Sequence, residues 1–173
     1  MNIETIITGA LEENCYVVTL GSKALIVDPG DDFQRIKKAY KDYDVIGILL
    51  THRHFDHIGA LLEVVQDTQA TIFENSNLKE KIYQVGPFQF QVIFTKGHTK
   101  DSVTYYFKEE KCMFVGDFIF QGSIGRMDLE GGDEEQMKES LHKIKQYPDD
   151  IVLYPGHGPR TSLKEEKQYN PYF

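Results

Sequence analysis

The sequence is poor in several features that would indicate other classes of protein. It has two cysteines among 173 residues, too few for a disulfide framework. No apolar run is long enough to span a bilayer, and the first residues lack the basic and then apolar layout of a signal peptide. The formal net charge is −8, whereas a protein that binds nucleic acid needs a basic face. We therefore expect a cytoplasmic protein with no nucleic-acid partner and no membrane partner.

The remaining composition is that of an ordinary globular chain. Apolar residues make up 40% of the sequence and charged residues 27%. A chain of this length buries a sizeable core, and no repeat, low-complexity tract or linker divides it. We expect a single domain over residues 1–173. Cys15 and Cys112 lie in or beside apolar runs, so we expect them to be core residues rather than nucleophiles.

Residues 51–57 hold three imidazoles and a carboxylate within a single short stretch. His52, His54, Asp56 and His57 are all side chains that bind first-row metal ions. A lone histidine beside an apolar run is usually structural. Four such groups in six residues fit that explanation badly, because each buried polar head would need its own partner. The stretch therefore predicts a metal site.

The flanking pattern predicts how this stretch is placed. The apolar run 45–50 indicates a buried strand. If the chain leaves that strand extended, His52 and His54 project to one side and Phe55 points to the core. A helix should begin near Asp56, because apolar residues then recur at helical spacing. They are Ile58, Leu61, Leu62 and Val65.

Two further helices are expected to begin at acidic residues. Asp31 is placed to cap a helix that turns Phe33, Ile36 and Tyr40 inward. Asp133 precedes a second helix, with Gln136 at the position of a capping box.

Potential ligands follow the ends of four apolar strands. Each strand runs into a small residue or turn and then into His52, His98, Asp117 or His157. Five of the six histidines lie in these loops, and the sixth, His142, is assigned no role. Loops at one edge of a sheet converge, as in other α/β enzymes, so we expect one common site.

Four motifs in order carry a family resemblance. They are His-x-His-x-Asp-His at 52–57, Gly-His-Thr at 97–99, Gly-Asp at 116–117 and Pro-Gly-His at 155–157. Together they resemble the metallo-β-lactamase superfamily, and within it the glyoxalase II branch of hydroxyacylglutathione hydrolases. The resemblance implies an α/β fold: a four-layer αββα sandwich of two mixed β-sheets flanked by helices.

The resemblance also implies a set of metal ligands. His52, His54 and His98 would hold a first divalent ion, and Asp56, His57 and His157 a second. Asp117 would bridge both, which makes Asp56 and Asp117 the expected catalytic carboxylates. Zinc is the expected metal, while iron and manganese also suit ligands of this kind.

Two departures bear on the substrate. Family members often read Gly-His-Thr-Pro-Gly-Ser where this chain has Lys100 and Asp101. The sequence also ends about where the helical glutathione-binding domain of eukaryotic glyoxalase II would begin. By resemblance, Arg126 would contact the thiol part of an anionic thioester, and the alternative is a surface ion pair with Asp128 or Glu130.

The expected activity is hydrolysis of a thioester by a metal-bound hydroxide at a two-metal site. The main alternative is a persulfide dioxygenase of the same superfamily, with a single iron on His52, His98 and Asp117. The segment 125–128 resembles that branch as well. A metal-stabilised binding protein is the third possibility. A cysteine is often found at the position of Asp117 in true lactamases, so antibiotic hydrolysis is disfavoured.

Overall fold

The computed structural model describes residues 1–173 as thirteen strands, five α-helices and one short 3-10 turn. The first elements are β1 (Asn2–Thr8), β2 (Glu13–Leu20), β3 (Lys23–Val27), α1 (Phe33–Tyr40), β4 (Asp44–Leu49), α2 (Phe55–Ile58), α3 (Leu61–Thr68) and β5 (Thr71–Phe73). The middle of the chain forms η1 (Asn75–Asn77), β6 (Ile82–Val85), β7 (Phe88–Phe94), β8 (Val103–Phe107), β9 (Cys112–Gly116), β10 (Ile119–Phe120) and β11 (Ser123–Ile124). The last elements are α4 (Glu134–Lys145), β12 (Val152–Pro155), β13 (Thr161–Ser162) and α5 (Leu163–Tyr169).

The strands form two mixed sheets. The first has the order β1-β2-β3-β4-β5, with antiparallel pairs up to β3 and parallel pairs from β3 to β5. The second has the order β13-β12-β9-β8-β7-β6, in which only β12 and β9 are parallel. β10 and β11 form a separate hairpin in the segment that follows Asp117.

Alternation along the strands explains why each sheet is covered on both faces. In β2, Tyr16 and Val18 belong to one buried cluster, whereas Cys15 and Val17 belong to another. Since successive side chains point to opposite faces, β2 is apolar on both sides. The same alternation in β9 divides Phe114 from its neighbours Met113 and Val115.

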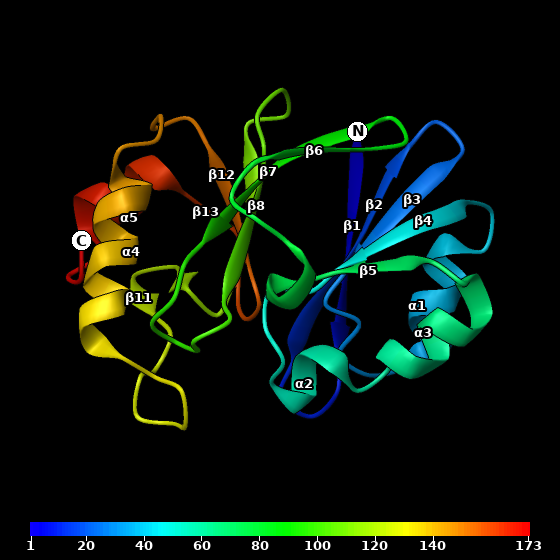
Figure 1. Ribbon diagram of the computed structural model, residues 1–173, viewed down its shortest axis with the longest axis horizontal. Helices are drawn as coiled ribbons and strands as arrows, with labels where there is room; N and C mark the ends of the chain where they lie inside the picture. The colour runs from blue at the N-terminus through cyan, green and yellow to red at the C-terminus, as the bar shows by residue number, and fades with distance from the viewer.

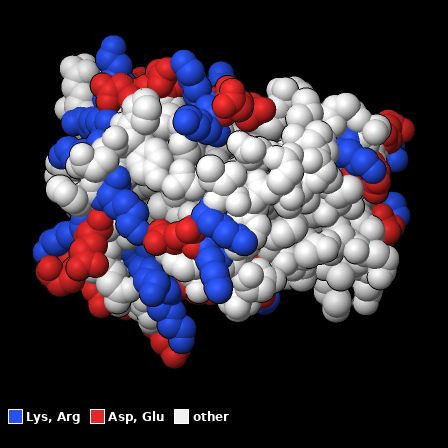
Figure 2. Space-filling view, turned by 45° about the horizontal axis from the view of Figure 1, so that its top comes forward, with Lys and Arg blue, Asp and Glu red and all other residues white.

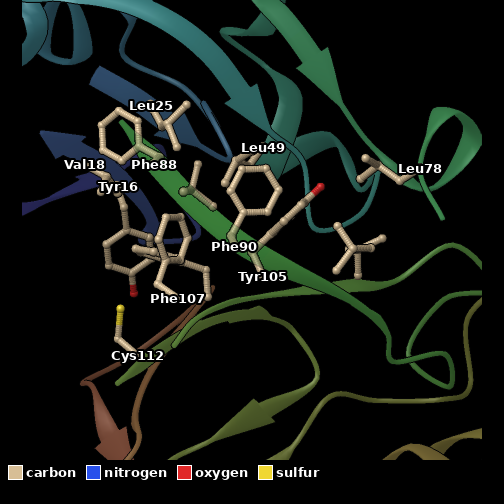
Figure 3. Close-up of a cluster of buried hydrophobic side chains, with 14 residues drawn as sticks. Tyr16, Val18, Leu25, Leu49, Leu78, Phe88, Phe90, Tyr105, Phe107 and Cys112 are labelled. Carbon is tan, nitrogen blue, oxygen red and sulfur yellow. The ribbon is translucent and has the colours of Figure 1, made fainter. Parts of the chain in front are cut away.

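Three buried clusters separate four layers. The first lies between the sheets, where Phe88, Phe90 and Tyr105 from the second sheet meet Leu25 and Leu49 from the first (Figure 3). The second cluster joins the first sheet to α1 and α3, and the third joins the second sheet to α4 and α5. Figure 1 shows the result, with helices outside two central sheets. The expected αββα sandwich is confirmed.

Three local expectations are wrong. Phe55 is 73% exposed instead of pointing to the core, and Leu62 is 67% exposed while Val64 is buried in its place. The helix is also split, because Ala60 donates its N–H to the carbonyls of Pro29 and Gly30. At Gly59 a Cβ would lie 2.2 Å from the Gly30 carbonyl oxygen, so this close approach requires glycine.

The expected helix caps have different outcomes. Asp32, with φ 55°, precedes α1 and makes no side-chain cap, so the assignment of the cap to Asp31 is wrong. Asp133 does cap α4, since its carboxylate accepts the backbone N–H of Gln136 at 2.9 Å. Gln136 also donates from its side chain to Asp133.

The surface over α4 and α5 is charged with both signs. Figure 2 shows basic side chains beside acidic ones on this half of the visible face. Ion pairs there include Lys143 with Glu80 and Lys167 with Asp149. The longest helix, α4, has 12 residues, and no helix has the length and apolar character needed to cross a bilayer.

Tyr105 tests how the two sheets are joined. The single proton of its buried hydroxyl is shared between the carbonyls of Leu50 at 2.7 Å and Phe73 at 2.8 Å, both in the other sheet layer. Tyr105→Phe would remove these bonds and should lower the free energy of unfolding by about 1–2 kcal/mol. Urea denaturation measures this change. Tyr43→Phe, at an exposed tyrosine, is the control and should leave the free energy of unfolding within about 0.5 kcal/mol.

Candidate metal centre

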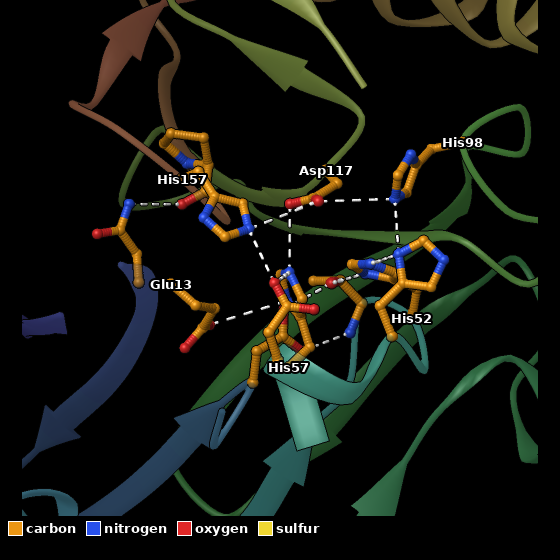
Figure 4. A network of polar contacts seen from close by, with 12 residues as sticks. Glu13, His52, His57, His98, Asp117 and His157 are labelled. Carbon is orange, nitrogen blue, oxygen red and sulfur yellow. Dashed lines mark hydrogen bonds and ion pairs between the residues drawn. The ribbon is translucent and has the colours of Figure 1, made fainter. Parts of the chain in front are cut away.

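The structure brings all seven predicted ligand side chains together in neighbouring groups. Figure 4 labels five of them, Asp117 and four histidines around it. The seven side chains come from the segments that follow β4, β7, β9 and β12, together with the first turn of α2. These strands belong to different sheets, so the site lies where the two sheets meet. The residues are His52, His54, Asp56, His57, His98, Asp117 and His157.

A first cluster consists of three histidine nitrogens. His52 Nε2 lies 3.1 Å from His54 Nδ1, and His98 Nε2 lies 3.0 Å from the same atom. Two nitrogens that both bind one ion at about 2.1 Å are roughly 3.0–3.4 Å apart. The three nitrogens therefore have the spacing of ligands around a single ion.

A second cluster lies beside the first. His157 Nε2 is 3.2 Å from Asp56 Oδ2, and His57 Nε2 is 4.0 Å from the same oxygen. His57 is fully buried, while Asp56 and His157 retain partial exposure. This cluster therefore opens to solvent on the side of Asp56 and His157.

Asp117 stands between the two clusters. Its Oδ1 is 3.3 Å from His57 Nε2. Its Oδ2 is 3.6 Å from His98 Nε2 and 3.7 Å from His157 Nε2. One carboxylate thus faces nitrogens of both clusters, which is the arrangement that a bridging ligand requires.

Four of the five histidines are oriented by a bond at Nδ1. His57 Nδ1 donates to Asp28 at 3.0 Å, and His98 Nδ1 donates to the Arg126 carbonyl at 2.7 Å. His157 Nδ1 donates to the Leu11 carbonyl at 3.1 Å. Since a carbonyl only accepts, the proton must sit on Nδ1, and Nε2 is left with a lone pair towards the site.

His52 is held in the same way through a hydroxyl. Thr51 donates its Oγ1–H to Asp28 at 2.5 Å and accepts from His52 Nδ1 at 3.0 Å. His54 is the exception, because it presents Nδ1 to the cluster. Its orientation relies on the chain path through the loop.

Asp28 is a functional residue that the sequence reasoning missed. Its carboxylate accepts from the Thr51 backbone N–H at 2.8 Å, the Thr51 hydroxyl and His57 Nδ1. The prediction treated Asp28 only as part of a turn before Pro29 and Gly30. A signal was present, since Asp28 follows the apolar strand β3 just as the predicted ligands follow theirs.

Glu13 was also missed, because it was placed in a polar turn. Instead it begins β2 and is fully buried, with Oε2 accepting from the Thr8 hydroxyl at 2.8 Å. Oε1 has no hydrogen-bond partner and lies 3.8 Å from His57 Nδ1. Burial raises the pKa of Glu13 to about 9, against the attraction of His57.

Two observations show that the site fits cations. His57 Nε2 and Asp117 Oδ1 are buried polar atoms without a hydrogen bond, an arrangement that costs free energy unless another partner is bound. Gly156 keeps the space between them open, since a Cβ there would lie 2.3 Å from Asp117 Oδ1. The donor set of imidazole and carboxylate suits divalent first-row ions.

Burial and the neighbouring charges shift the pKa values of the site residues in different directions. Burial lowers the pKa of His52 and of His54, so both stay neutral and able to bind an ion. Burial would also lower the pKa of His57, but Asp117 and Asp28 outweigh it and raise that pKa. Burial alone would raise the pKa of the Asp117 carboxyl, but the nearby His57 outweighs burial and lowers that pKa.

Arg126 contacts the site through its backbone. Its carbonyl accepts from His98, while its guanidinium makes two 2.7 Å bonds to the carboxylate of Asp128. The side chains of both are more than 60% exposed. A surface ion pair with Asp128 was the alternative to substrate binding that the sequence suggested for Arg126. The role of Arg126 in substrate binding remains a prediction.

Both cysteines are buried, as expected. Burial raises the pKa of the Cys15 thiol well above its ordinary value and that of Cys112 to about 12. Neither thiol is therefore a nucleophile at neutral pH.

Comparison with known proteins places this site in a family. The family model described as the metallo-beta-lactamase superfamily matches residues 8–82 and 80–157. The chain belongs to the metallo-beta-lactamase superfamily. Membership and the histidine–aspartate cluster together indicate a metallo-hydrolase type of site that binds divalent metal.

Three relatives within the superfamily inform the function. The hydroxyacylglutathione hydrolase GloC of Haemophilus influenzae is 31% identical, over 99% of this chain and 98% of its own length. The crystal structure of BLEG-1 B3 metallo-beta-lactamase has 32% identity and a TM-score of 0.95, covering 99% of both chains. The di-iron-bound form of TTHA1623 has 30% identity and a TM-score of 0.90, covering 98% of this chain and all of that one.

A substitution at Asp28 tests whether its hydrogen bonds to His57 and Thr51 support metal binding. Its φ of 46° lies in the left-handed region, which asparagine also tolerates, so Asp28→Asn keeps the backbone. The amide cannot accept all three bonds of the carboxylate, and we expect metal affinity to fall about 10- to 100-fold. Competition with a chromogenic chelator measures this affinity. Unchanged affinity would contradict a role for Asp28, and Asp42→Asn, at a surface carboxylate, is the matched control.

Proposed function

We propose that this protein is a thioester hydrolase that uses two divalent metal ions. The observation that supports it is the position of Asp117, whose two oxygens face nitrogens of both clusters. Seven ligand side chains are too many for a single four-coordinate site. His52, His54 and His98 would hold one ion, Asp56, His57 and His157 the other, and Asp117 would bridge them.

The choice of a thioester rests on similarity and on the site's chemistry. GloC is named as a hydroxyacylglutathione hydrolase and matches this chain over nearly its whole length. Neither cysteine is available for covalent catalysis, because both are buried. When bound, a pair of divalent ions supplies water of lowered pKa and a Lewis acid for the carbonyl.

The protein's own residues prepare the site for this reaction. Asp28 and Thr51 hold a proton on Nδ1 of His57 and His52, which directs Nε2 of both rings towards the ions. Asp56 and Asp117 bring negative charge that offsets the two cations. In the dinuclear proposal all seven ligands are used, whereas the persulfide dioxygenase alternative would leave His54, Asp56, His57 and His157 without a role.

One experiment separates the candidate reactions. Metal is counted on protein purified from unsupplemented cells, and the same sample is assayed for thioester cleavage, oxygen uptake and hydrolysis of a β-lactam. Two ions per chain with thioester cleavage is the expected result. One iron per chain with thiol-dependent oxygen uptake would instead indicate a dioxygenase. The β-lactam is included because BLEG-1 is described as a B3 metallo-beta-lactamase.

A substitution at Asp117 tests most directly whether one carboxylate bridges the two ions. Asp117→Asn removes the charge that offsets two adjacent cations, so at least one ion and more than about 99% of thioester hydrolysis should be lost, since such electrostatic contributions reach several kcal/mol. Metal analysis and kinetics measure the two effects. His142→Ala on α4 should change neither. Full metal content and full rate in Asp117→Asn would refute the assignment of the bridge.

Arg126 tests which part of the substrate lies near His98. If the guanidinium leaves Asp128 to bind an anionic thiol group, Arg126→Ala should raise KM up to about tenfold and change kcat little, because the contact is remote from the scissile bond. The comparison uses an anionic and a neutral thioester. Equal effects on both would show that Arg126 does not detect charge. Lys138→Ala, at an equally exposed ion-paired cation on α4, is the control.

A further inference from the structure

An open groove lies beside the second cluster. It has a volume of about 250 Å³ and runs between the β1–β2 turn and the start of α2. Asp56 lines it, and the turn that forms its opposite wall holds His157 through the Leu11 carbonyl. The groove is therefore continuous with the candidate metal centre.

The walls of this groove carry apolar side chains that the fold does not bury. Phe55 is 73% exposed and Leu11 is 53% exposed, and both line the groove together with Ala10. A single exposed apolar residue is common on any protein surface. Two large ones facing the same hollow next to a cluster of ligands are typical of a binding site.

The charges of the groove exclude an anionic occupant. Its only ionisable side chains are Asp31 and Asp56, and no lysine or arginine lines it. A second hollow of about 440 Å³ adjoins His54 in the first cluster and has mixed charges, with Arg53 and Lys100 beside Asp101 and Glu130 in its lining. Arg53 is paired with Glu74. Lys100 has no ion-pair partner among the salt bridges of the structure, so it remains available to an anionic group.

We propose that the groove formed by Leu11 and Phe55 binds the apolar acyl chain of the substrate. This inference rests on the proposed thioester hydrolysis and extends it to the substrate class, namely thioesters of short-chain fatty acids. The charged thiol half of the substrate then lies towards Lys100 and Arg126, on the side of the first cluster. The two hollows thus set the direction in which a thioester lies across the metal centre.

Binding of simple carboxylates tests the groove without any turnover. Acetate, butyrate and hexanoate are titrated into the metal-loaded protein in a calorimeter. The three ligands share the same carboxylate head group and differ only in the length of the alkyl chain. A buried methylene strengthens binding about fourfold, and roughly twofold is expected in a half-open groove. Hexanoate should therefore bind at least about tenfold more tightly than acetate.

Variants then locate the effect. Leu11→Ala should reduce the difference between hexanoate and acetate to about threefold or less. It keeps the backbone carbonyl that holds His157, and metal analysis checks that the ions are retained. Phe55→Ala should act in the same direction from the other wall. Leu62→Ala removes a similarly exposed leucine on α3 outside the groove and should preserve the full difference. Equal affinities for acetate and hexanoate, or a full difference in both Leu11→Ala and Phe55→Ala, would overturn the proposal.

Thioester kinetics on the same proteins separate this inference from the proposed function. Acetyl and hexanoyl thioesters of one thiol are compared by kcat/KM. If neither is cleaved while carboxylate binding still depends on Leu11 and chain length, the groove stands and the hydrolase assignment fails. If both are cleaved equally and hexanoate binds no better than acetate, the hydrolase assignment stands and the acyl groove is refuted.

Discussion

The balance of charge at Asp117 is the constraint on which the site depends. Its carboxylate is almost fully enclosed and faces His57, His98 and His157, yet Oδ1 lacks a hydrogen bond. A buried anion is stable only when cations or donors surround it. Here the neighbours are imidazoles that present Nε2 to the carboxylate, and divalent ions bound between them would complete the arrangement. Gly156 maintains the necessary space, because any side chain there would enter it.

The sandwich supplies this arrangement through its strand ends. β4, β9 and β12 end in apolar or small residues, and a potential ligand follows within three residues of each strand's end. Because both faces of each sheet are buried, the strands are held in place, and they fix the points at which the ligand-bearing loops begin and end. Tyr105 adds a direct link between the sheets at Leu50, two residues before His52. A rigid core thus positions ligands that the loops alone would leave mobile.

Much of this could be predicted from the sequence. The spacing of His52, His54, Asp56 and His57, and the positions of His98, Asp117 and His157 after apolar runs, identified all seven side chains that the structure brings together. The layered fold came from the family resemblance, since local patterns show strands and helices but not their pairing. Phe55 was misplaced because the alternation of side chains in a strand was assumed to continue past the end of β4. Phe55 instead begins α2, where its side chain faces solvent while Asp56 and His57 face the site. Glu13 was missed because a buried carboxylate has no local pattern.

The orientation of the histidines shows why such sites are only partly visible in a sequence. Two of the acceptors that fix them are the backbone carbonyls of Leu11 and Arg126, which any residue type could provide. Their positions depend on the paths of the β1–β2 turn and of the chain after β11. The β1–β2 turn also presents the Leu11 side chain to the groove beside Asp56. One short turn therefore determines both the tautomer of His157 and the apolar wall next to it, so that a change in its length would alter metal binding and substrate preference together.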